Sequence, residues 1–320
     1  MTPPRSGATP RRRVVVRRRV TALTLLVAGA LALGVAIAGL GGGSAGSPPS
    51  PAFVRIELEG QTVARRKVSE LRSPRSLAAM LSEVPASRTV HRGPATFHLH
   101  VERGDVPRAV ERAVRNGGGA ITVREQPVAT RIRVPIVKQA LQDNCEAAAL
   151  SMVLAYSGKP VGQLALQSQV AHSPPLDPTV AANGSEVWGD PSQGFVGRAD
   201  GGGPAGGFGV YQGPIQALAR RHGVVLHDLT DSSPAAVYEA LLRGHPVMVW
   251  VALSNGPFAT WSSPSGQSIR VNYGEHALVL TGVDPADVRV NDPLSGTRLT
   301  WSKPQFEQMW KGLGRRALSA

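Results

Sequence analysis

Residues 144–156 read NCEAAALSMVLAY and shape the second half of the chain. From Glu146 to Tyr156 the stretch is apolar on nearly every side, which is typical of a helix buried in a core rather than one lying on a surface. Ser157-Gly158 follows directly, and glycine is a common residue just past the end of a helix. The pattern therefore predicts a buried central helix that begins beside Cys145.

Cys145 is the only cysteine among the 320 residues, so the chain forms no intrachain disulfide. Its predicted position is the first turn of the buried helix. Backbone N–H groups there are unpaired and carry partial positive charge, which favours a thiolate and lowers the pKa of the thiol. These properties make Cys145 a candidate nucleophile, whereas an inert buried cysteine is the alternative interpretation.

A nucleophilic cysteine needs a base, normally histidine, and a third residue that orients it. His276 begins a predicted strand 131 residues after Cys145, and Asp292 ends the next strand, 16 residues later. His245 is the rival base, but no acidic residue follows it on an adjacent predicted strand. Asn291 is the alternative to Asp292 as the orienting residue.

Gln139 lies six residues before Cys145. From that distance a side-chain amide can join the Cys145 backbone N–H in binding the oxyanion of an acyl-transfer intermediate. The alternative is a solvated loop residue.

The C-terminal part of the chain is expected to form an antiparallel sheet. Residues 246–253 form a continuous apolar strand, and residues 276–283 and 288–291 form two strands joined by the turn Asp284-Pro285-Ala286-Asp287. Helices are predicted over 214–222 and 233–243, and residues 160–210 are rich in Gly, Pro, Asp and Ser, as in long loops. One buried helix against this sheet gives an α+β fold, expected over residues 131–320.

A small α+β module of unknown role is expected over residues 52–130. It has predicted strands at 54–58, 97–101 and 120–123 and helices at 73–81 and 105–115. His98 and His100 share one strand face. A metal site there lacks cysteine or clustered carboxylate support, so a solvated strand face is favoured.

The N-terminal segment predicts a membrane location. Residues 1–19 form a basic tail, residues 20–40 an uncharged run long enough to span hydrocarbon as a helix, and residues 41–51 a flexible linker. The arginines should stay cytoplasmic, which leaves the rest of the chain extracytoplasmic. A signal anchor is favoured by the length of the run, and a cleaved signal peptide is the alternative.

The net charge of +13 is unevenly distributed. The first 50 residues hold seven arginines and no acidic residue, whereas residues 136–320 hold 13 basic and 14 acidic residues. A near-neutral main domain argues against nucleic-acid binding.

The motifs also resemble those of a known family, the C39-like cysteine peptidases of the papain-like clan, which include bacteriocin-leader-processing domains. The resemblance rests on residues 134–139 with 144–154, on Gly244-His245-Pro246-Val247, on residues 275–282 and on residues 290–294, and it covers about residues 131–315. It implies a papain-like fold and a peptide substrate, with no metal and no organic cofactor. It further implies Cys145 as nucleophile, His276 as general base, Asp292 as orienting residue and Gln139 as oxyanion donor.

The sequence departs from the transporter-linked members of that family, because no G-x-x-x-x-G-K-[ST] phosphate-binding motif is present. The function expected overall is that of a membrane-anchored, extracytoplasmic cysteine peptidase or amidase. The alternatives are a C39-like module that binds a peptide or cell-wall ligand without cleaving it, and an acyl or peptidyl transferase of the same clan.

Overall fold

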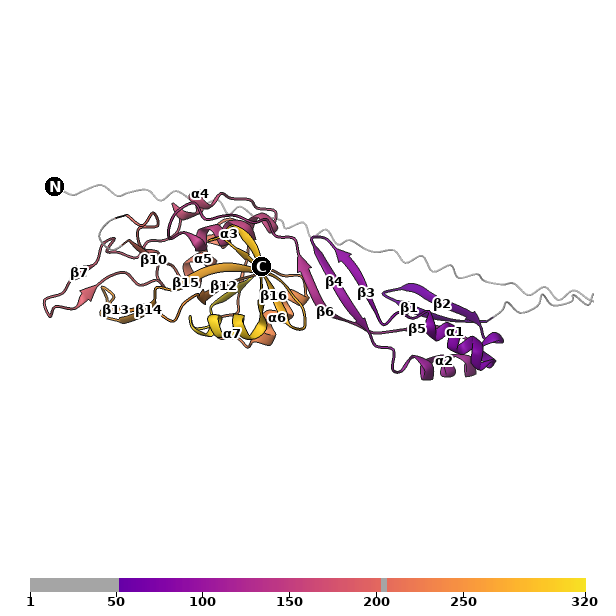
Figure 1. The fold of residues 1–320 in the computed structure, drawn as a ribbon. Coiled ribbons are helices and arrows are strands. Elements are labelled where there is room, and N and C mark those ends of the chain that lie inside the picture. The colour runs from indigo at the N-terminus through magenta and orange to yellow at the C-terminus, as the bar shows by residue number, and fades with distance from the viewer. Residues whose placement is uncertain (1–51, 203–205) are drawn as a thin grey trace, which may run out of the picture. The chain divides into compact units, whose positions relative to one another are not determined.

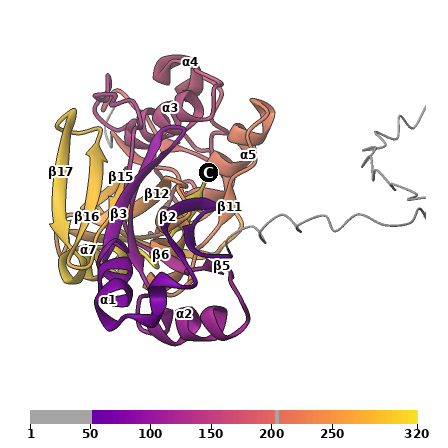
Figure 2. The same ribbon diagram turned by 90° about the vertical axis from the view of Figure 1, so that its right-hand side faces the viewer.

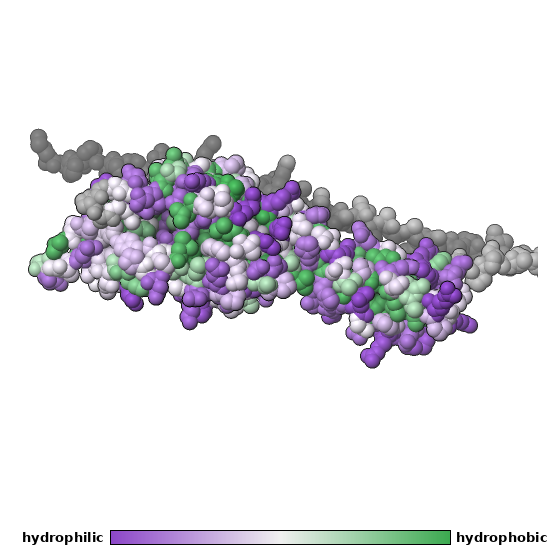
Figure 3. All heavy atoms as spheres, viewed as in Figure 1, coloured by the Kyte–Doolittle hydropathy of each residue, from purple (hydrophilic) through white to green (hydrophobic). Residues whose placement is uncertain are grey.

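The computed structural model describes residues 52–202 and 206–320. The expected basic tail, membrane segment and linker therefore lie outside the described residues. Within the described ranges, no helix has both the length and the apolar character needed to cross a membrane. Figure 3 shows polar and apolar residues interspersed on one face, and the large exposed apolar side chains include Leu164, Val180 and Phe258.

The central sheet is antiparallel along its whole length, as the sequence predicts for its C-terminal strands. Its strand order is β11 (His227–Asp228), β18 (Ala317–Ser319), β12 (Val247–Ala252), β15 (Glu275–Val283), β6 (Glu125–Ile132), β4 (Ala95–Val101) and β3 (Ser87–Arg92). A hairpin of β16 (Asp287–Asp292) and β17 (Thr297–Ser302) also pairs with β15. Eight of the nine residues of β15 are buried, so both faces of this strand are covered.

The predicted central helix is confirmed as α3 (Cys145–Tyr156), whose first ten residues are all buried. It packs on β15 and β12, while α6 (Pro234–Leu242) and α7 (Lys303–Lys311) lie on the opposite side of these strands (Figures 1 and 2). The remaining helices are α4 (Gln163–Gln167) and α5 (Gln212–Arg221). Helix α3 therefore needs no polar face, because it packs against β12, β15, α4 and α5.

The Gly-rich region over 160–210 is mostly irregular, as expected, but it contains short strands. β8 (Glu186–Val187) and β7 (Thr179–Val180) extend a hairpin formed by β13 (Phe258–Ser262) and β14 (Ser268–Asn272). A second pair joins β9 (Val196–Gly197) to β10 (Gly207–Gly209), which leads into α5. Two- and three-residue strands give too short a pattern for sequence to reveal.

The N-terminal described residues form a separate small sheet with its own core. β1 (Phe53–Leu58) pairs with β2 (Gln61–Lys67) and β5 (Gly119–Thr122), and the 3-10 helix η1 (Glu70–Arg72), α1 (Pro74–Ser82) and α2 (Val106–Arg115) complete the segment. Its buried side chains include Val54, Ile56, Met80 and Val110.

The expected domain boundary at residue 131 falls inside strand β6. This strand pairs with β4 along most of its length, and its residues Thr130 and Arg131 also pair with β15. Phe97 and Ile132 belong to the same buried cluster as the residues of α3. His98 and His100, on β4, are exposed, and His98 Nδ1 lies 2.9 Å from Thr89 Oγ1.

Candidate active site

Cys145 is the first residue of α3, and a hydrogen-bonded turn fixes the entry to that helix. The side chain of Asn144 is fully buried: its Oδ1 accepts from the Leu141 N–H at 2.9 Å, and its Nδ2 donates to Gln163 Oε1 at 3.0 Å. These bonds satisfy the amide of a buried polar residue. They also hold Cys145, which is 6% exposed, at the N-terminal end of the buried helix.

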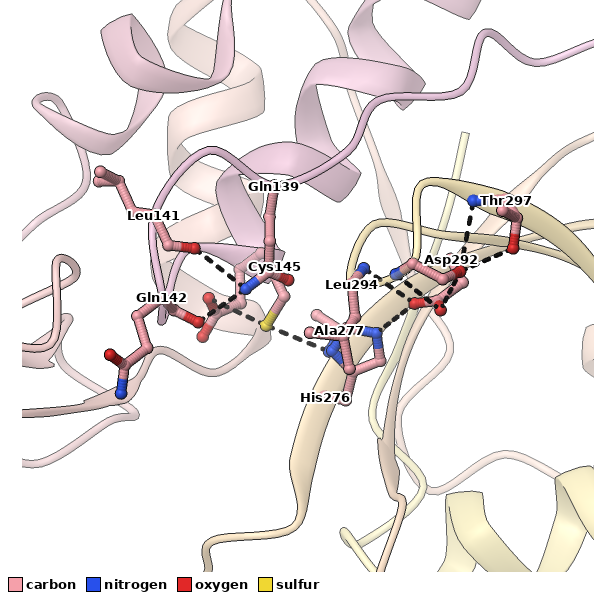
Figure 4. A network of polar contacts seen from close by, with 11 residues as sticks. Gln139, Leu141, Gln142, Cys145, His276, Ala277, Asp292, Leu294 and Thr297 are labelled. Atoms are coloured by element: carbon pink, nitrogen blue, oxygen red, sulfur yellow. Dashed lines mark hydrogen bonds and ion pairs between the residues drawn. The ribbon is translucent and has the colours of Figure 1, made fainter.

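Strand β15 contacts this sulfur through the residue that follows the predicted histidine. The Ala277 N–H donates to Cys145 Sγ at 3.4 Å, and His276 precedes Ala277 directly. Figure 4 shows the sulfur lying between the turn that contains Gln139 and the His276–Ala277 strand. The segments that carry Cys145 and His276, 131 residues apart in sequence, are therefore in contact.

His276 pairs with Asp292 on the next strand. Their Nε2 and Oδ1 atoms are 2.6 Å apart, and their side chains are 5% and 10% exposed. Val279 opposes Asn291 in the β15–β16 ladder, so His276 and Asp292 form a diagonal cross-strand pair on the same face. Because Asp292 occupies Nε2, Nδ1 is the ring nitrogen left to interact with Cys145.

Asp292 is held by the turn that follows it. Oδ1 also accepts from the Leu294 N–H at 3.0 Å, and Oδ2 accepts from the N–H and hydroxyl of Ser295 at 3.1 and 2.7 Å. Burial alone would raise the pKa of Asp292, but the hydrogen bonds with His276 and Ser295 outweigh burial and lower it below its ordinary value. Asp292 is therefore an ionised, rigidly positioned partner for His276.

The rival residues lie elsewhere. Asn291, the neighbour of Asp292 on β16, turns its Nδ2 to the backbone oxygens of Val134 and Pro135 at 3.1 and 3.2 Å, as the alternation of a strand requires. His245 is exposed just before β12, and no hydrogen bond or ion pair among the described residues joins its side chain to Cys145.

Gln139 lies on the turn before α3, but its amide group is already engaged. Nε2 donates to the backbone oxygens of Leu141 and Gln142 at 3.1 and 2.7 Å, while Oε1 is buried and has no hydrogen-bond partner within residues 52–202 and 206–320. The Gln139 backbone N–H in turn donates to the Pro293 oxygen at 2.8 Å, which ties the turn to the end of β16. In this arrangement the Gln139 amide braces the turn.

The expected lowering of the Cys145 pKa is wrong for this arrangement. Burial, followed by the charges of Glu146 and Glu275, raises the pKa of the thiol well above its ordinary value, against the opposing effect of the Ala277 N–H. A position at a helix N-terminus is visible in the sequence, whereas complete burial beside two carboxyl groups is not.

Glu146 and Glu275 are the site residues that the sequence interpretation missed. Each is the immediate neighbour of a predicted catalytic residue, and one donor atom each from Cys145, Glu146 and Glu275 lie within 4.8 Å of one another. Glu146 Oε1 accepts from the Val210 N–H at 2.6 Å, and its Oε2 lies 3.5 Å from the Cys145 sulfur, so one carboxyl group of this set already has hydrogen-bond partners. An acidic residue in an otherwise apolar helix was the available signal.

Comparisons with known proteins cover the same part of the chain. Residues 131–318 match the model of the Peptidase_C39 like family. "Uncharacterized protein YvpB" of Bacillus subtilis (strain 168) is 37% identical over 182 residues, which make up 56% of this chain and 69% of that protein.

Two solved structures are also similar. A putative C39-like peptidase from Bacillus anthracis is 30% identical, with a TM-score of 0.50 over 58% of this chain and 94% of that one. A double glycine motif protease from an AMS/PCAT transporter, in complex with the leader peptide, is 17% identical, with a TM-score of 0.33 over 59% of this chain and 91% of that one.

Proposed function

Because the chain belongs to the Peptidase_C39 like family, we propose that it is a cysteine peptidase or amidase whose nucleophile is Cys145. The observation that carries the proposal is the connected set of contacts from the sulfur through strand β15 to Asp292. The Ala277 N–H reaches Sγ at 3.4 Å, and the neighbouring His276 is held by Asp292 at 2.6 Å. Nucleophile, base and orienting carboxylate are the three groups that acyl transfer through cysteine requires.

The reaction follows from these positions. The Cys145 thiol gives its proton to His276 Nδ1, and the thiolate attacks the carbonyl carbon of a peptide or amide bond. The imidazolium that forms is stabilised by the Asp292 carboxylate and then protonates the leaving amine. Water, activated by the same imidazole, hydrolyses the acyl-enzyme and restores the thiol.

The oxyanion of the tetrahedral intermediate forms at the N-terminal end of α3. The Cys145 backbone N–H is one donor, because the first N–H groups of a helix have no partner within it. Gln139 Nε2 supplies the second donor. To do so it gives up its hydrogen bond to the Leu141 oxygen, at 3.1 Å the longer of its two contacts, and donates to the oxyanion instead. The amide then changes from bracing the turn to binding the intermediate.

A hollow beside the Leu141 turn is a candidate place for part of a peptide substrate. It measures about 410 Å³, and its lining includes Leu141, Leu164, Leu176 and Arg198. Asp200 also lines it, and the Arg198 guanidinium is paired with Asp177 at 2.8 Å, so the apolar side chains of the lining suit an apolar substrate residue.

We further propose that the enzyme works outside the cytoplasmic membrane, anchored by residues 20–40. The support is the uncharged run itself, preceded by six arginines within residues 11–19. In cells that express the full chain, the undigested protein should be found in the membrane fraction. Protease added outside intact cells should then digest residues 52–320. Protection of the C-terminal part in intact cells would contradict the proposed orientation.

One observation favours a second candidate function, a peptide-binding module without catalysis. The raised pKa of the Cys145 thiol means that a neutral thiol predominates unless His276 or a neighbouring carboxyl offsets the effect of burial. A neutral, buried thiol can help to hold a peptide without cleaving it.

Labelling of Cys145 separates the two functions. Because the chain has a single cysteine, iodoacetamide uptake measured by intact mass reports on this sulfur alone. At pH 6.5 we expect rapid labelling that His276→Ala slows at least about tenfold, with His245→Ala as the matched control. Labelling that is slow and indifferent to His276 would contradict the nucleophile and favour the binding module. Cleavage of a peptide library that disappears in Cys145→Ser would then identify the substrate bond.

A further inference from the structure

Glu146 places a carboxyl oxygen against the reacting sulfur, although the mechanism above does not use it. Its Oε2 lies 3.5 Å from Cys145 Sγ, and the residue is only 1% exposed. A buried carboxyl group at that distance either donates a hydrogen bond to sulfur, when it is protonated, or accepts one, when it is ionised. Its protonation state therefore bears directly on whether the thiolate can form.

The backbone just after strand β10 prevents this carboxyl group from turning away. The Val210 N–H donates to Glu146 Oε1 at 2.6 Å, and Trp250 Nε1 donates to the Val210 oxygen at 2.9 Å. Gly209 closes the space on the same side, because a Cβ atom there would lie 2.4 Å from Oε1. These contacts keep the other carboxyl oxygen of Glu146, Oε2, close to Cys145 Sγ.

Glu275 provides a second carboxyl group in the same buried space. Its Oε1 is buried and accepts no hydrogen bond from the residues that the structure describes, and the residue lies on β15 immediately before His276. Burial, aided by the charge of Glu146, raises the pKa of Glu275 well above its ordinary value. Burial also raises the pKa of Glu146 to about 7, so this pair retains protons at a pH where most carboxyl groups are ionised.

The other charged groups around the pair do not cancel this effect. Asp143, on the turn before α3, raises the pKa of both glutamates further, and Arg316, before β18, lowers that of Glu275. The Arg316 guanidinium lies over the Tyr211 ring at 3.7 Å, and among the described residues it forms no ion pair with either glutamate.

We propose that Glu146 is a catalytic residue that controls the Cys145 nucleophile through its own protonation. As an acid, its O–H donates to the thiolate sulfur, while the proton released by the thiol lies on His276 Nδ1. As a carboxylate, it accepts the S–H of the neutral thiol and opposes the negative charge on sulfur. No proton passes between Glu146 and sulfur in either state. The inference rests on the proposed function, because it concerns the same nucleophile.

The consequence is a thiol that is most reactive at mildly acidic pH. A negative charge on Glu146, whose Oε2 lies 3.5 Å from the sulfur, disfavours a second negative charge on that sulfur. Ionisation of Glu146 should therefore suppress thiolate formation at least about tenfold.

Two variants of Glu146 separate the charge from the hydrogen bond. Glu146→Gln keeps an oxygen for the Val210 N–H and a donor for the sulfur but never ionises, whereas Glu146→Ala removes both donor and charge. We measure the iodoacetamide rate constant of each full-length variant from pH 5.5 to 8.5 in EDTA, with Glu239→Gln, an exposed helix residue, as the matched control.

The proposal predicts how the rate ratio of each variant to the wild type changes with pH. For Glu146→Gln the ratio should be near one at pH 5.5, and at pH 8.5 the variant should react at least about ten times faster than the wild type. For Glu146→Ala it should fall below one at pH 5.5, because the donor is lost, and exceed one at pH 8.5. The thiolate absorbance near 240 nm, taken as the difference from Cys145→Ser, should follow the same pattern and does not depend on reagent access.

The outcomes distinguish this inference from the proposed function. A ratio for Glu146→Gln that is constant with pH, in a protein whose labelling still depends on His276, overturns the role of Glu146 and leaves the peptidase proposal standing. Labelling that is indifferent to His276 overturns the peptidase proposal, whatever the Glu146 ratios. A pH-dependent ratio that appears only when EDTA is omitted indicates a bound metal ion and also overturns the inference.

Discussion

Asp292 Oδ1 lies 2.6 Å from His276 Nε2, and the turn after Asp292 holds the carboxylate from the other side. With Nε2–H donating to the carboxylate, the lone pair of neutral His276 is at Nδ1, toward the helix that begins at Cys145. The tautomer that can accept the thiol proton is therefore selected by a residue that does not touch the sulfur.

Replacement of Asp292 should impair catalysis in a graded way. Asp292→Ala removes the orienting acceptor and should lower kcat/KM at least about 100-fold. Asp292→Asn retains an oxygen that can accept from Nε2–H, and its loss should be smaller. Asp287→Asn, at the far end of the same strand β16, is the control and should be near wild type. Equal losses in the alanine and asparagine variants would contradict an orienting role.

The lowered pKa of Asp292 also predicts how stability depends on pH. A carboxyl group whose pKa is lower in the folded state stabilises the fold above its ordinary pKa of 3.8, and this contribution is lost as pH falls through the folded-state value. The wild type should exceed Asp292→Asn by about 2 kcal/mol in free energy of unfolding at pH 6. Urea denaturation should show the difference shrinking below pH 4, and a difference constant down to pH 2 would contradict the assignment.

Glu146 predicts a pH dependence of the opposite sign. Its pKa rises from 4.5 to about 7 on folding, so the folded state binds the proton more tightly and the wild type loses stability as pH rises from 4.5 to 7. Glu146→Gln does not carry this cost and should be about 3 kcal/mol more stable than the wild type above pH 7. Thermal melts at pH 4 and pH 8 provide the check. A variant that is less stable than the wild type at both pH values would contradict the predicted cost of ionising Glu146.

Much of this arrangement could be predicted from the sequence, and the reasons differ among the parts. The helix at Cys145 and strands β12, β15 and β16 were predicted because buried elements leave long apolar runs bounded by Gly, Pro and Asp. His276 and Asp292 followed from their positions on adjacent strands. That these two side chains meet diagonally across the strands depends only on the register of the β15–β16 hairpin.

Other features depend on long-range packing, which leaves no local pattern. The continuation of the main sheet from β15 through β6 to β4 and β3 was not predicted, because β6 carries several polar residues and its buried positions do not alternate regularly. The pKa of Cys145 was predicted in the wrong direction because the sequence shows the helix start but not the burial of the thiol itself beside the carboxyl groups of Glu146 and Glu275. The membrane segment and linker lie outside the described residues and remain predictions.

Gly209 is expected to be intolerant of any side chain. Its φ of +122° disfavours other residues, and an added Cβ would lie 2.4 Å from Glu146 Oε1. Gly209→Ala should therefore lower the free energy of unfolding by about 3 kcal/mol. Gly223→Ala, also at positive φ but with nothing within 4 Å, should cost about 1 kcal/mol. If contact with Glu146 is the cause, Glu146→Ala should recover part of the loss in the Gly209 variant and not in the Gly223 variant.

Gln139 offers the sharpest test of how the oxyanion is bound, because a second glutamine supports the same turn. Gln163 Oε1 accepts from the Ala140 N–H at 2.9 Å, and its Nε2 donates to the Lys138 oxygen at 2.7 Å. If the Gln139 amide binds the oxyanion, Gln139→Ala should lower kcat about 100-fold or more with little change in KM, because the interaction exists only in the transition state.

Gln163→Ala removes support from the turn without removing a proposed donor to the oxyanion. It should raise KM or lower stability and leave kcat within about tenfold of the wild type. Gln139→Glu, which keeps the shape but loses the N–H donors, should be as impaired in kcat as Gln139→Ala. Matching losses in the Gln139 and Gln163 variants would instead assign Gln139 to the turn alone, as its present contacts with Leu141 and Gln142 already allow.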